Sequence, residues 1–346
     1  MGPSRPSSMF AHPSARNARA PARRAVLAAA AVLAALSFAP PCLAQGSESF
    51  PSKPLRLVVP FAPGGAADVI GRSVAEQLQR ELGQSVVVVN RDGAGTIVGV
   101  NYVAKAPGDG YTLLLSGDAA TINTASGRTL PYDFLRELTP VSVLFSGAQI
   151  LLVSKDSPFK TLQDMVSYAR ANPGKLRYGS SGIGTSIHLS EASFNAAADI
   201  EALHVPYRGV APAITDLIGG QVDYVIAGSS LATPAIQSGQ LRALAITTAK
   251  RSPMLPDIPT AKEQGVDVET MGWYGLFVPA TTPPAIVARL NAATLAALKS
   301  PELSERFKSI GGEARGTSPA EAGAFVKAEI RKFSELMRRL NIKLDN

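Results

Sequence analysis

The segment Leu55-Arg56-Leu57-Val58-Val59-Pro60-Phe61-Ala62-Pro63-Gly64-Gly65 opens the first regular unit of the chain. Residues 55–60 are apolar apart from Arg56 and predict a strand, and the Pro- and Gly-rich residues that follow predict a tight turn. A helix is expected next, because apolar residues recur every four positions at Ile70, Val74, Leu78 and Leu82, and Gly83 ends the pattern. A strand that turns directly into a helix is the basic unit of an α/β fold.

The same alternation continues along the chain. Further strands are predicted at 85–89, 111–115, 178–180, 203–205, 222–226 and 241–247. The first of these is an unbroken β-branched run, as expected of a parallel sheet that is covered on both faces. The long apolar stretches 141–153 and 271–279 are expected to cross between two lobes.

The C-terminal part predicts three helices with explicit start signals. These signals are Pro283-Pro284, Ser300-Pro301-Glu302 and Ser318-Pro319-Ala320-Glu321, the last being a capping box with Pro at the first helical position. The final helix carries an apolar stripe, which predicts that it packs on the surface of a lobe.

The N-terminus has the layout of a secretory signal peptide. Arg23 and Arg24 precede the apolar run 25–39, and the small residues Cys42 and Ala44 favour cleavage after residue 44. The run is shorter than the ~20 residues that a membrane helix needs. We therefore expect residues 1–44 to be removed and the mature protein to be soluble and exported, while the choice between the general and the twin-arginine export route stays open.

Removal of the leader changes the charge of the protein. The chain has 34 Lys and Arg against 27 Asp and Glu, and the leader holds five arginines and no acid, so 29 basic residues remain. A nearly neutral mature chain argues against nucleic-acid binding. The one cysteine, Cys42, also lies in the leader, which excludes a thiolate metal site, a thiol nucleophile and a disulfide in the mature protein.

Four Gly- or hydroxyl-rich loops follow strands and precede helices, at 60–68, 90–99, 116–123 and 179–188. Ligands bind at this edge of open α/β sheets, and helix N-termini there favour an anion. Each loop taken alone also fits an ordinary tight connection.

Some polar residues near these loops have both a functional and a structural interpretation. Asp68 lies in the first turn of its helix, and we interpret it as an anchor of the loop. His188 either donates to a ligand or has a structural role, His204 is interpreted as structural, and Arg208 is either a salt-bridge partner of an anion or a solvated loop residue. Trp273 and Tyr274 either line a cleft or pack in the core.

Enzyme signatures are incomplete. The glycines of 93–99 resemble a dinucleotide-binding fingerprint, but their spacing is one residue too long. There is no phosphate-binding loop or nucleophile elbow, and the two mature histidines are too few for a metal cluster. A Ser181–His188 pair lacks an orienting acid. An exported hydrolase or oxidoreductase acting on a small organic acid is the alternative function.

Seven motifs, in order along the chain, carry a family resemblance. They are 51–56, 59–68, 90–95, 106–113, 178–185, 204–209 and 273–277, including Val59-Pro60-Phe61-Ala62-Pro63-Gly64-Gly65-Ala66-Ala67-Asp68 and Tyr178-Gly179-Ser180-Ser181-Gly182-Ile183-Gly184-Thr185. The sequence resembles the periplasmic substrate-binding proteins of tripartite tricarboxylate transporters, the Bug family, which implies a periplasmic location. The resemblance implies a two-lobe Venus-flytrap fold in which each lobe is a mostly parallel sheet flanked by helices. Lobe one is expected at 46–147 with 271–346, and lobe two at 148–270.

The resemblance also implies that the protein is not an enzyme. It is expected to be a binding protein that passes a carboxylate to a membrane permease. We expect a monomer without metal or other cofactor. The expected ligand-binding residues are Phe61, Gly64, Gly65, Ala66, Thr121, Asn123, Ser181, Gly184, Thr185, Ser186 and Arg208. Where relatives often have an acid that meets a ligand amino group, this chain has Ala227. The absence of that acid favours a plain carboxylate or a neutral acid derivative over an amino acid, and two opposed N–H-rich loops favour a dicarboxylate.

Overall fold

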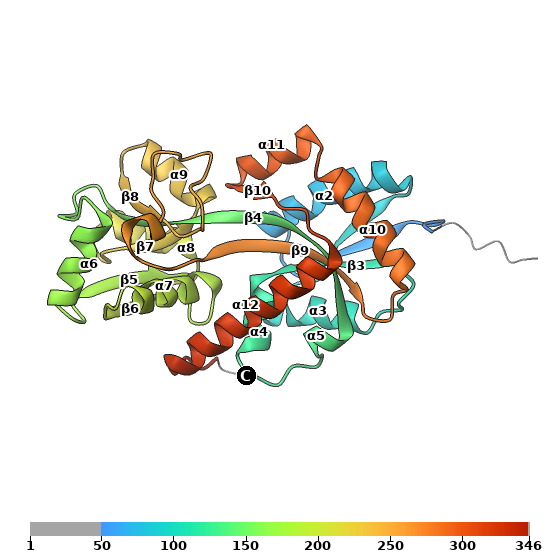
Figure 1. Cartoon of the computed structure of the whole chain (residues 1–346), viewed down its shortest axis with the longest axis horizontal. Helices are drawn as coiled ribbons and strands as arrows, with labels where there is room; N and C mark the ends of the chain where they lie inside the picture. The colour runs from blue at the N-terminus through green and yellow to red at the C-terminus, as the bar shows by residue number, and fades with distance from the viewer. Residues whose placement is uncertain (1–49, 345–346) are drawn as a thin grey trace, which may run out of the picture. The chain divides into compact units, whose positions relative to one another are not determined.

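The computed structural model describes residues 50–344 (Figure 1). The predicted signal peptide, 1–44, lies outside these residues. Within the described part, no helix combines the length and the apolar character needed to cross a membrane.

The first lobe is built on parallel strands. β1 (Leu55–Val59) lies between β2 (Val86–Asn90) and β3 (Thr112–Gly117) and is parallel to both. Four of the five β1 side chains are buried, as the apolar sequence predicts. β9 (Met271–Pro279), β4 (Leu138–Ser154) and β10 (Gly312–Ala314) extend the sheet beyond β3 in antiparallel pairs.

Helices cover this sheet. They are α2 (Ala66–Leu82), α3 (Ile97–Ala104), α4 (Asp118–Ala125), α5 (Phe134–Glu137), α10 (Pro284–Ala297), α11 (Pro301–Ser309) and α12 (Pro319–Arg339), and the short 3-10 helix η1 (Ala94–Thr96) precedes α3. The predicted helix ends are confirmed: Gly83 ends α2 with φ +68°, and α12 begins with the Ser318–Glu321 capping box.

The second lobe uses the far half of β4. β7 (Val225–Gly228) and β8 (Leu241–Ile246) pair with β4 in antiparallel fashion, and β5 (Leu176–Ser180) pairs in parallel with β6 (Ala202–Pro206). A parallel bridge from Tyr178 to Tyr224 links β5 to the segment before β7. The surrounding helices are α6 (Leu162–Ala171), α7 (Ser186–Ala197), α8 (Val210–Ile218), α9 (Ser229–Gln237) and η2 (Lys262–Gln264).

β4 and β9 connect the two lobes and run side by side through the middle of Figure 1. In each lobe most strands point in one direction, and the antiparallel pairs arise where these two strands join the sheets. Separate apolar cores, one including Leu57 and Leu144 and another including Leu151 and Phe194, lie on either side. The boundaries at 147–148 and 270–271 remain a prediction, which this division of the cores supports.

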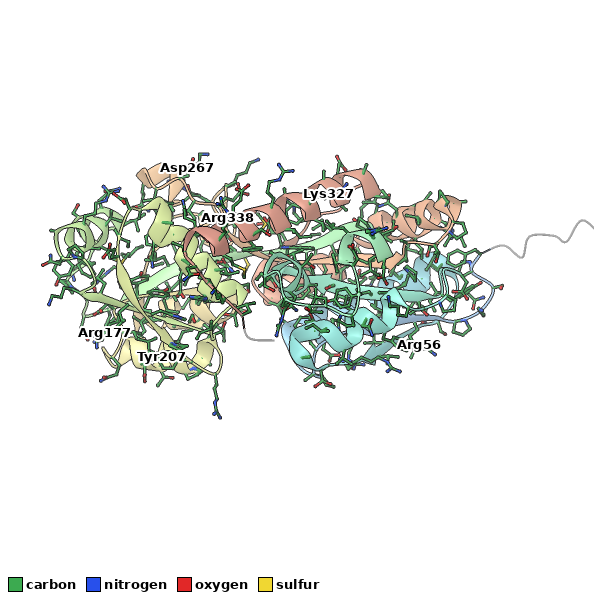
Figure 2. All side chains as sticks on the ribbon, turned by 90° about the horizontal axis from the view of Figure 1, so that it is seen from below. Arg56, Arg177, Tyr207, Asp267, Lys327 and Arg338 are labelled. Carbon is green, nitrogen blue, oxygen red and sulfur yellow. The ribbon has the colours of Figure 1, made fainter. Side chains whose placement is uncertain are left out.

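α12 contacts more than the first lobe. Val326 packs in a core with Trp273, whereas Phe333 and Met337, near the end of the helix, form a small cluster with Ile122 of α4 and Leu189 of α7. Exposed basic side chains such as Lys327 and Arg338 lie along the helix (Figure 2). The end of the helix therefore contacts both lobes, which the sequence did not predict.

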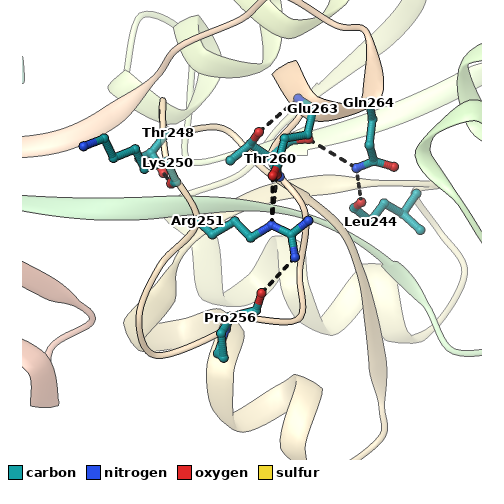
Figure 3. A network of polar contacts seen from close by, with 8 residues as sticks. All are labelled: Leu244, Thr248, Lys250, Arg251, Pro256, Thr260, Glu263 and Gln264. Atoms are coloured by element: carbon teal, nitrogen blue, oxygen red, sulfur yellow. Dashed lines mark hydrogen bonds and ion pairs between the residues drawn. The ribbon is translucent and has the colours of Figure 1, made fainter.

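The segment that leads from β8 to β9 is fixed by polar contacts. Arg251 pairs with Glu263 at 3.0 Å and donates to the carbonyl of Pro256, and the Glu263 carboxylate accepts the N–H of Thr260 at 2.7 Å (Figure 3). Gln264 donates to the Leu244 carbonyl at 2.9 Å. These bonds hold the chain in place where it enters the second crossing strand.

Candidate ligand-binding site

A cavity of about 950 Å³ lies between the lobes. The first lobe contributes residues from the loop before α2, from α4 and from the C-terminal segment, and the second lobe contributes the starts of α7, α8 and α9. The crossing strands form another side through Gly147, Gln149, Gly272 and Tyr274. The cavity is therefore bounded by both lobes and by the strands that join them.

Five helices begin at this cavity. The first residues of α2, α4, α7, α8 and α9 line it, namely Ala66, Asp118, Ser186, Val210 and Ser229. The first N–H groups of a helix have no partner within the helix, and they carry the positive end of its dipole. Such convergence from two lobes favours an anion between them.

The loop before α2 is shaped by Asp68. The Asp68 carboxylate accepts the Gly64 N–H at 3.0 Å and the Asn90 amide at 2.9 Å, and it pairs with Arg72 at 3.0 Å. Gly64 has a φ of +89°, which suits glycine. The hydrogen bond from Arg72, together with those from Gly64 and Asn90, lowers the pKa of Asp68 to about 2. The interpretation of Asp68 as a loop anchor is confirmed.

The corresponding loop of the second lobe is held by Thr185 and His188. The Thr185 hydroxyl accepts the His188 N–H at 3.4 Å, donates to the Gly182 carbonyl at 2.8 Å and accepts the Ser181 hydroxyl at 2.8 Å. His188 Nδ1 accepts the Gly184 N–H at 3.1 Å, and its ring stacks on His204 at 4.1 Å. Burial and the neighbouring His204 lower the pKa of His188 to about 4. The neutral ring therefore supports the loop.

Asn123 supports a third loop. Its amide donates to the Gly95 carbonyl at 2.6 Å, and both residues line the cavity. Thr121 is fully buried, and its hydroxyl donates to the Asp118 carbonyl inside α4.

The structure brings together six of the predicted site residues. Phe61, Ala66, Asn123, Gly184, Thr185 and Ser186 line the cavity. The other predicted residues do not line the cavity. Gly64 and Gly65 precede Ala66 in the same loop. Thr121 bonds within α4, and Ser181 bonds to Thr185. Arg208 is exposed and lies outside the cavity lining. Tyr274 lines the cavity, whereas Trp273 is buried in the core.

Sequence reasoning missed several residues of this site. Asp118 lies in the predicted loop 116–123 but is not among the expected ligand-binding residues, and neither are Gln149 and Lys343. Leu344 was missed as well, and it lies so close to Gly184 that a side chain there would overlap it. The position of Asp118 directly after a strand and at the start of a helix was the available signal, because the other predicted loops share it.

The cavity carries charges of both signs. Among residues 50–344, Asp118 is the acidic residue of the lining, and Arg128 and Lys343 are the basic ones. Burial raises the pKa of Asp118 to about 6, although the Ala119 N–H and the Ser186 hydroxyl that bond to it act in the opposite direction. Across residues 50–344, no cluster of three or more His, Cys, Asp or Glu side chains is placed to hold a metal ion.

Comparison with known proteins identifies the family. Residues 70–342 match the model of the tripartite tricarboxylate transporter family receptor. A UPF0065 protein from the tcbD-tcbE intergenic region of Pseudomonas sp. (strain P51) is 39% identical over 296 residues, which cover 85% of this chain and 88% of the relative. Protein BugT of Bordetella pertussis is 33% identical over 301 residues, covering 86% and 92%.

Solved structures agree with this match. Rpa4515 of R. palustris, determined with adipate, is 37% identical with a TM-score of 0.72, and the alignment covers 85% of this chain and 99% of that one. MatC of Rhodopseudomonas palustris, determined with bound malate, is 32% identical with a TM-score of 0.68, covering 83% and 99%. The chain therefore belongs to the tripartite tricarboxylate transporter receptor family, also called the Bug family, whose members are periplasmic solute-binding proteins and not enzymes.

Proposed function

We propose that this protein captures a small organic carboxylate, with a dicarboxylate as the first candidate, in the cavity between its lobes. The observation that carries the proposal is the convergence of five helix N-termini from both lobes on one cavity. Backbone N–H groups at such termini bind carboxylate oxygens without requiring a basic side chain. The adipate and malate in the two related structures support this class of ligand.

The arrangement of the site suggests how binding is coupled to closure. Ala66 begins α2 in the first lobe and Ser186 begins α7 in the second, so a ligand with an acidic group at each end engages both lobes. A ligand that contacts both lobes binds the closed form more tightly and shifts the population toward it. We propose that the closed, loaded form is the state delivered to a membrane permease of the tripartite tricarboxylate type.

Export and oligomeric state complete the proposal. Cleavage of residues 1–44 would release a periplasmic protein, and we propose that it binds its ligand as a monomer.

A thermal-shift screen of the mature protein tests the proposed function. The ligands are mono- and dicarboxylates of increasing length, and each dicarboxylate is paired with its uncharged diamide. A ligand at ~100 times its Kd adds about 2.7 kcal/mol to the free energy of unfolding, which raises Tm by roughly several °C. At least one carboxylate is expected to give such a shift while its diamide does not. A screen without any carboxylate response, or equal shifts with the diamides, contradicts the proposal.

A further inference from the structure

Asp118 offers unused hydrogen-bond acceptors to the cavity. Its carboxylate accepts the Ala119 N–H and the Ser186 hydroxyl. A carboxylate has about four acceptor sites, so two of them remain for a ligand. No Lys or Arg among residues 50–344 forms an ion pair with it. When ionised, the Asp118 side chain repels a plain anion and attracts a hydrogen-bond donor.

Gln149 supplies a second unused acceptor. The residue lines the cavity although it is only 3% exposed, and its buried Oε1 atom has no hydrogen-bond partner in the described protein. The backbone carbonyl of the same residue is already occupied by Thr247. A buried polar atom without a partner costs free energy, and a ligand atom that pairs with it recovers that cost.

The two acceptors lie along the same side of the crossing strands. Asp118 Oδ2 lies 4.0 Å from the position that a Cβ atom of Gly272 would occupy. Gly272 is in register with Gly147 of β4, and Gln149 is two residues farther along that strand. Side chains two residues apart on a strand point to the same face. Asp118 and Gln149 are therefore placed to contact the same part of a small ligand.

We propose that Asp118 and Gln149 select a carboxylate that also carries a hydrogen-bond donor, either a hydroxyl or an ammonium group. The inference rests on the proposed function, since the carboxylate itself is assigned to the helix N-termini. A site with buried acceptors discriminates against an analogue that lacks the donor, because the acceptors then stay unpaired. The inference changes the expectation based on Ala227, because an acid does line the cavity, but it comes from α4.

Matched ligand series test the inference by isothermal titration calorimetry. Succinate, malate and aspartate share one skeleton and differ in having no donor, a hydroxyl or an ammonium group. Glutarate, 2-hydroxyglutarate and glutamate form a second series, and adipate, 2-hydroxyadipate and 2-aminoadipate a third. In the series that binds most tightly, a donor-bearing acid is expected to bind about ten- to a hundredfold more tightly than the plain acid. Whichever acid of that series binds more tightly, the hydroxy acid or the amino acid, identifies the donor.

Asp118→Asn tests the role of the carboxylate, with Asp133→Asn as the control. Asp133 caps α5 in the same lobe and lies outside the cavity lining. Asp118→Asn is expected to remove most of the preference for the donor-bearing acid, the loss being larger for an ammonium than for a hydroxyl, while Asp133→Asn keeps the preference. Gln149→Leu provides an independent variant if Asp118→Asn does not fold, and it should reduce the same preference.

The outcomes separate the two proposals. If the plain acids bind as tightly as the donor-bearing acids, the inference fails and the proposed function stands. If the donor-bearing acids are preferred but both variants keep that preference, the assignment to Asp118 and Gln149 is wrong. If no acid in any series binds, the inference and the choice of a dicarboxylate both fail, and the monocarboxylates of the thermal-shift screen test the rest of the proposed function.

Discussion

At the scale of single residues, Asp68 shows how a side chain outside the cavity lining shapes the site. It joins the Gly64 N–H, the Asn90 amide and the Arg72 guanidinium, and the Asn90 amide also donates to the Phe61 carbonyl at 3.0 Å. The loop that presents Phe61 and Ala66 to the cavity therefore depends on one buried carboxylate.

Asp68→Ala is expected to lower the free energy of unfolding at pH 7 by about 1–3 kcal/mol, because it leaves polar groups of the loop without a partner. The folded-state pKa of Asp68 is lowered to about 2 from an ordinary value of 3.8. Its stabilising effect is thus present above pH 4 and lost as the pH falls from about 4 to about 2.

Urea unfolding of wild type and variant at pH 7 and near pH 2.5 measures this effect. The difference between the two proteins should shrink at the lower pH. Asp92→Ala serves as the control, because Asp92 is exposed in the same lobe and should show a small difference at both pH values. A difference for Asp68→Ala that is equally large at low pH argues against the carboxylate as its source.

Local residues of the site were predictable from sequence, and remote ones were not. The side chains of Asp68, Thr185 and His188 bond to backbone groups within four residues of themselves, so the turn and cap chemistry visible in the sequence is sufficient. Gln149 lies in a long apolar stretch that gives no sign of a site. Asp118 meets the strand β9, more than 150 residues away in sequence, and only the pairing of β3 with β9 brings them together.

At the scale of elements, the helix N-termini include both the best-predicted features of the fold and the groups that are proposed to bind the ligand. The starts of α10, α11 and α12 were predictable because all three have Pro at the first position, and α11 and α12 also have Ser at the cap. The starts of α8 and α9 follow Gly209 and Gly228 without a capping side chain. Their approach to the cavity depends on the sheet that places them, so sequence did not predict it.

Thr185→Ala tests the N-terminus of α7, and Thr161→Ala is its matched control. Thr161 caps α6 in the same lobe through Asp164, away from the cavity. Each variant loses a helix cap and should lose about 1 kcal/mol of stability. Only Thr185→Ala is expected to weaken carboxylate binding, by roughly five- to tenfold. Calorimetric titration that finds equal affinities for the two variants would refute a role of Thr185 in the site.

At the scale of the whole molecule, the crossing strands determine the site. The two long apolar stretches predicted them, and β4 serves both lobes by pairing with β9 in one half and with β7 and β8 in the other. The cluster of Phe333 and Met337 with Leu189 joins residues more than 140 positions apart, and no local pattern encodes it. The end of α12 and Leu344 thereby add a further contact between the lobes beside the cavity.

A crystal structure of the mature protein with its tightest-binding carboxylate tests the central claim most directly. The ligand is expected in the cavity, with carboxylate oxygens about 3 Å from backbone N–H groups at the start of α2 in one lobe and of α7 in the other. A ligand bound outside the cavity, or held by one lobe alone, would contradict the account.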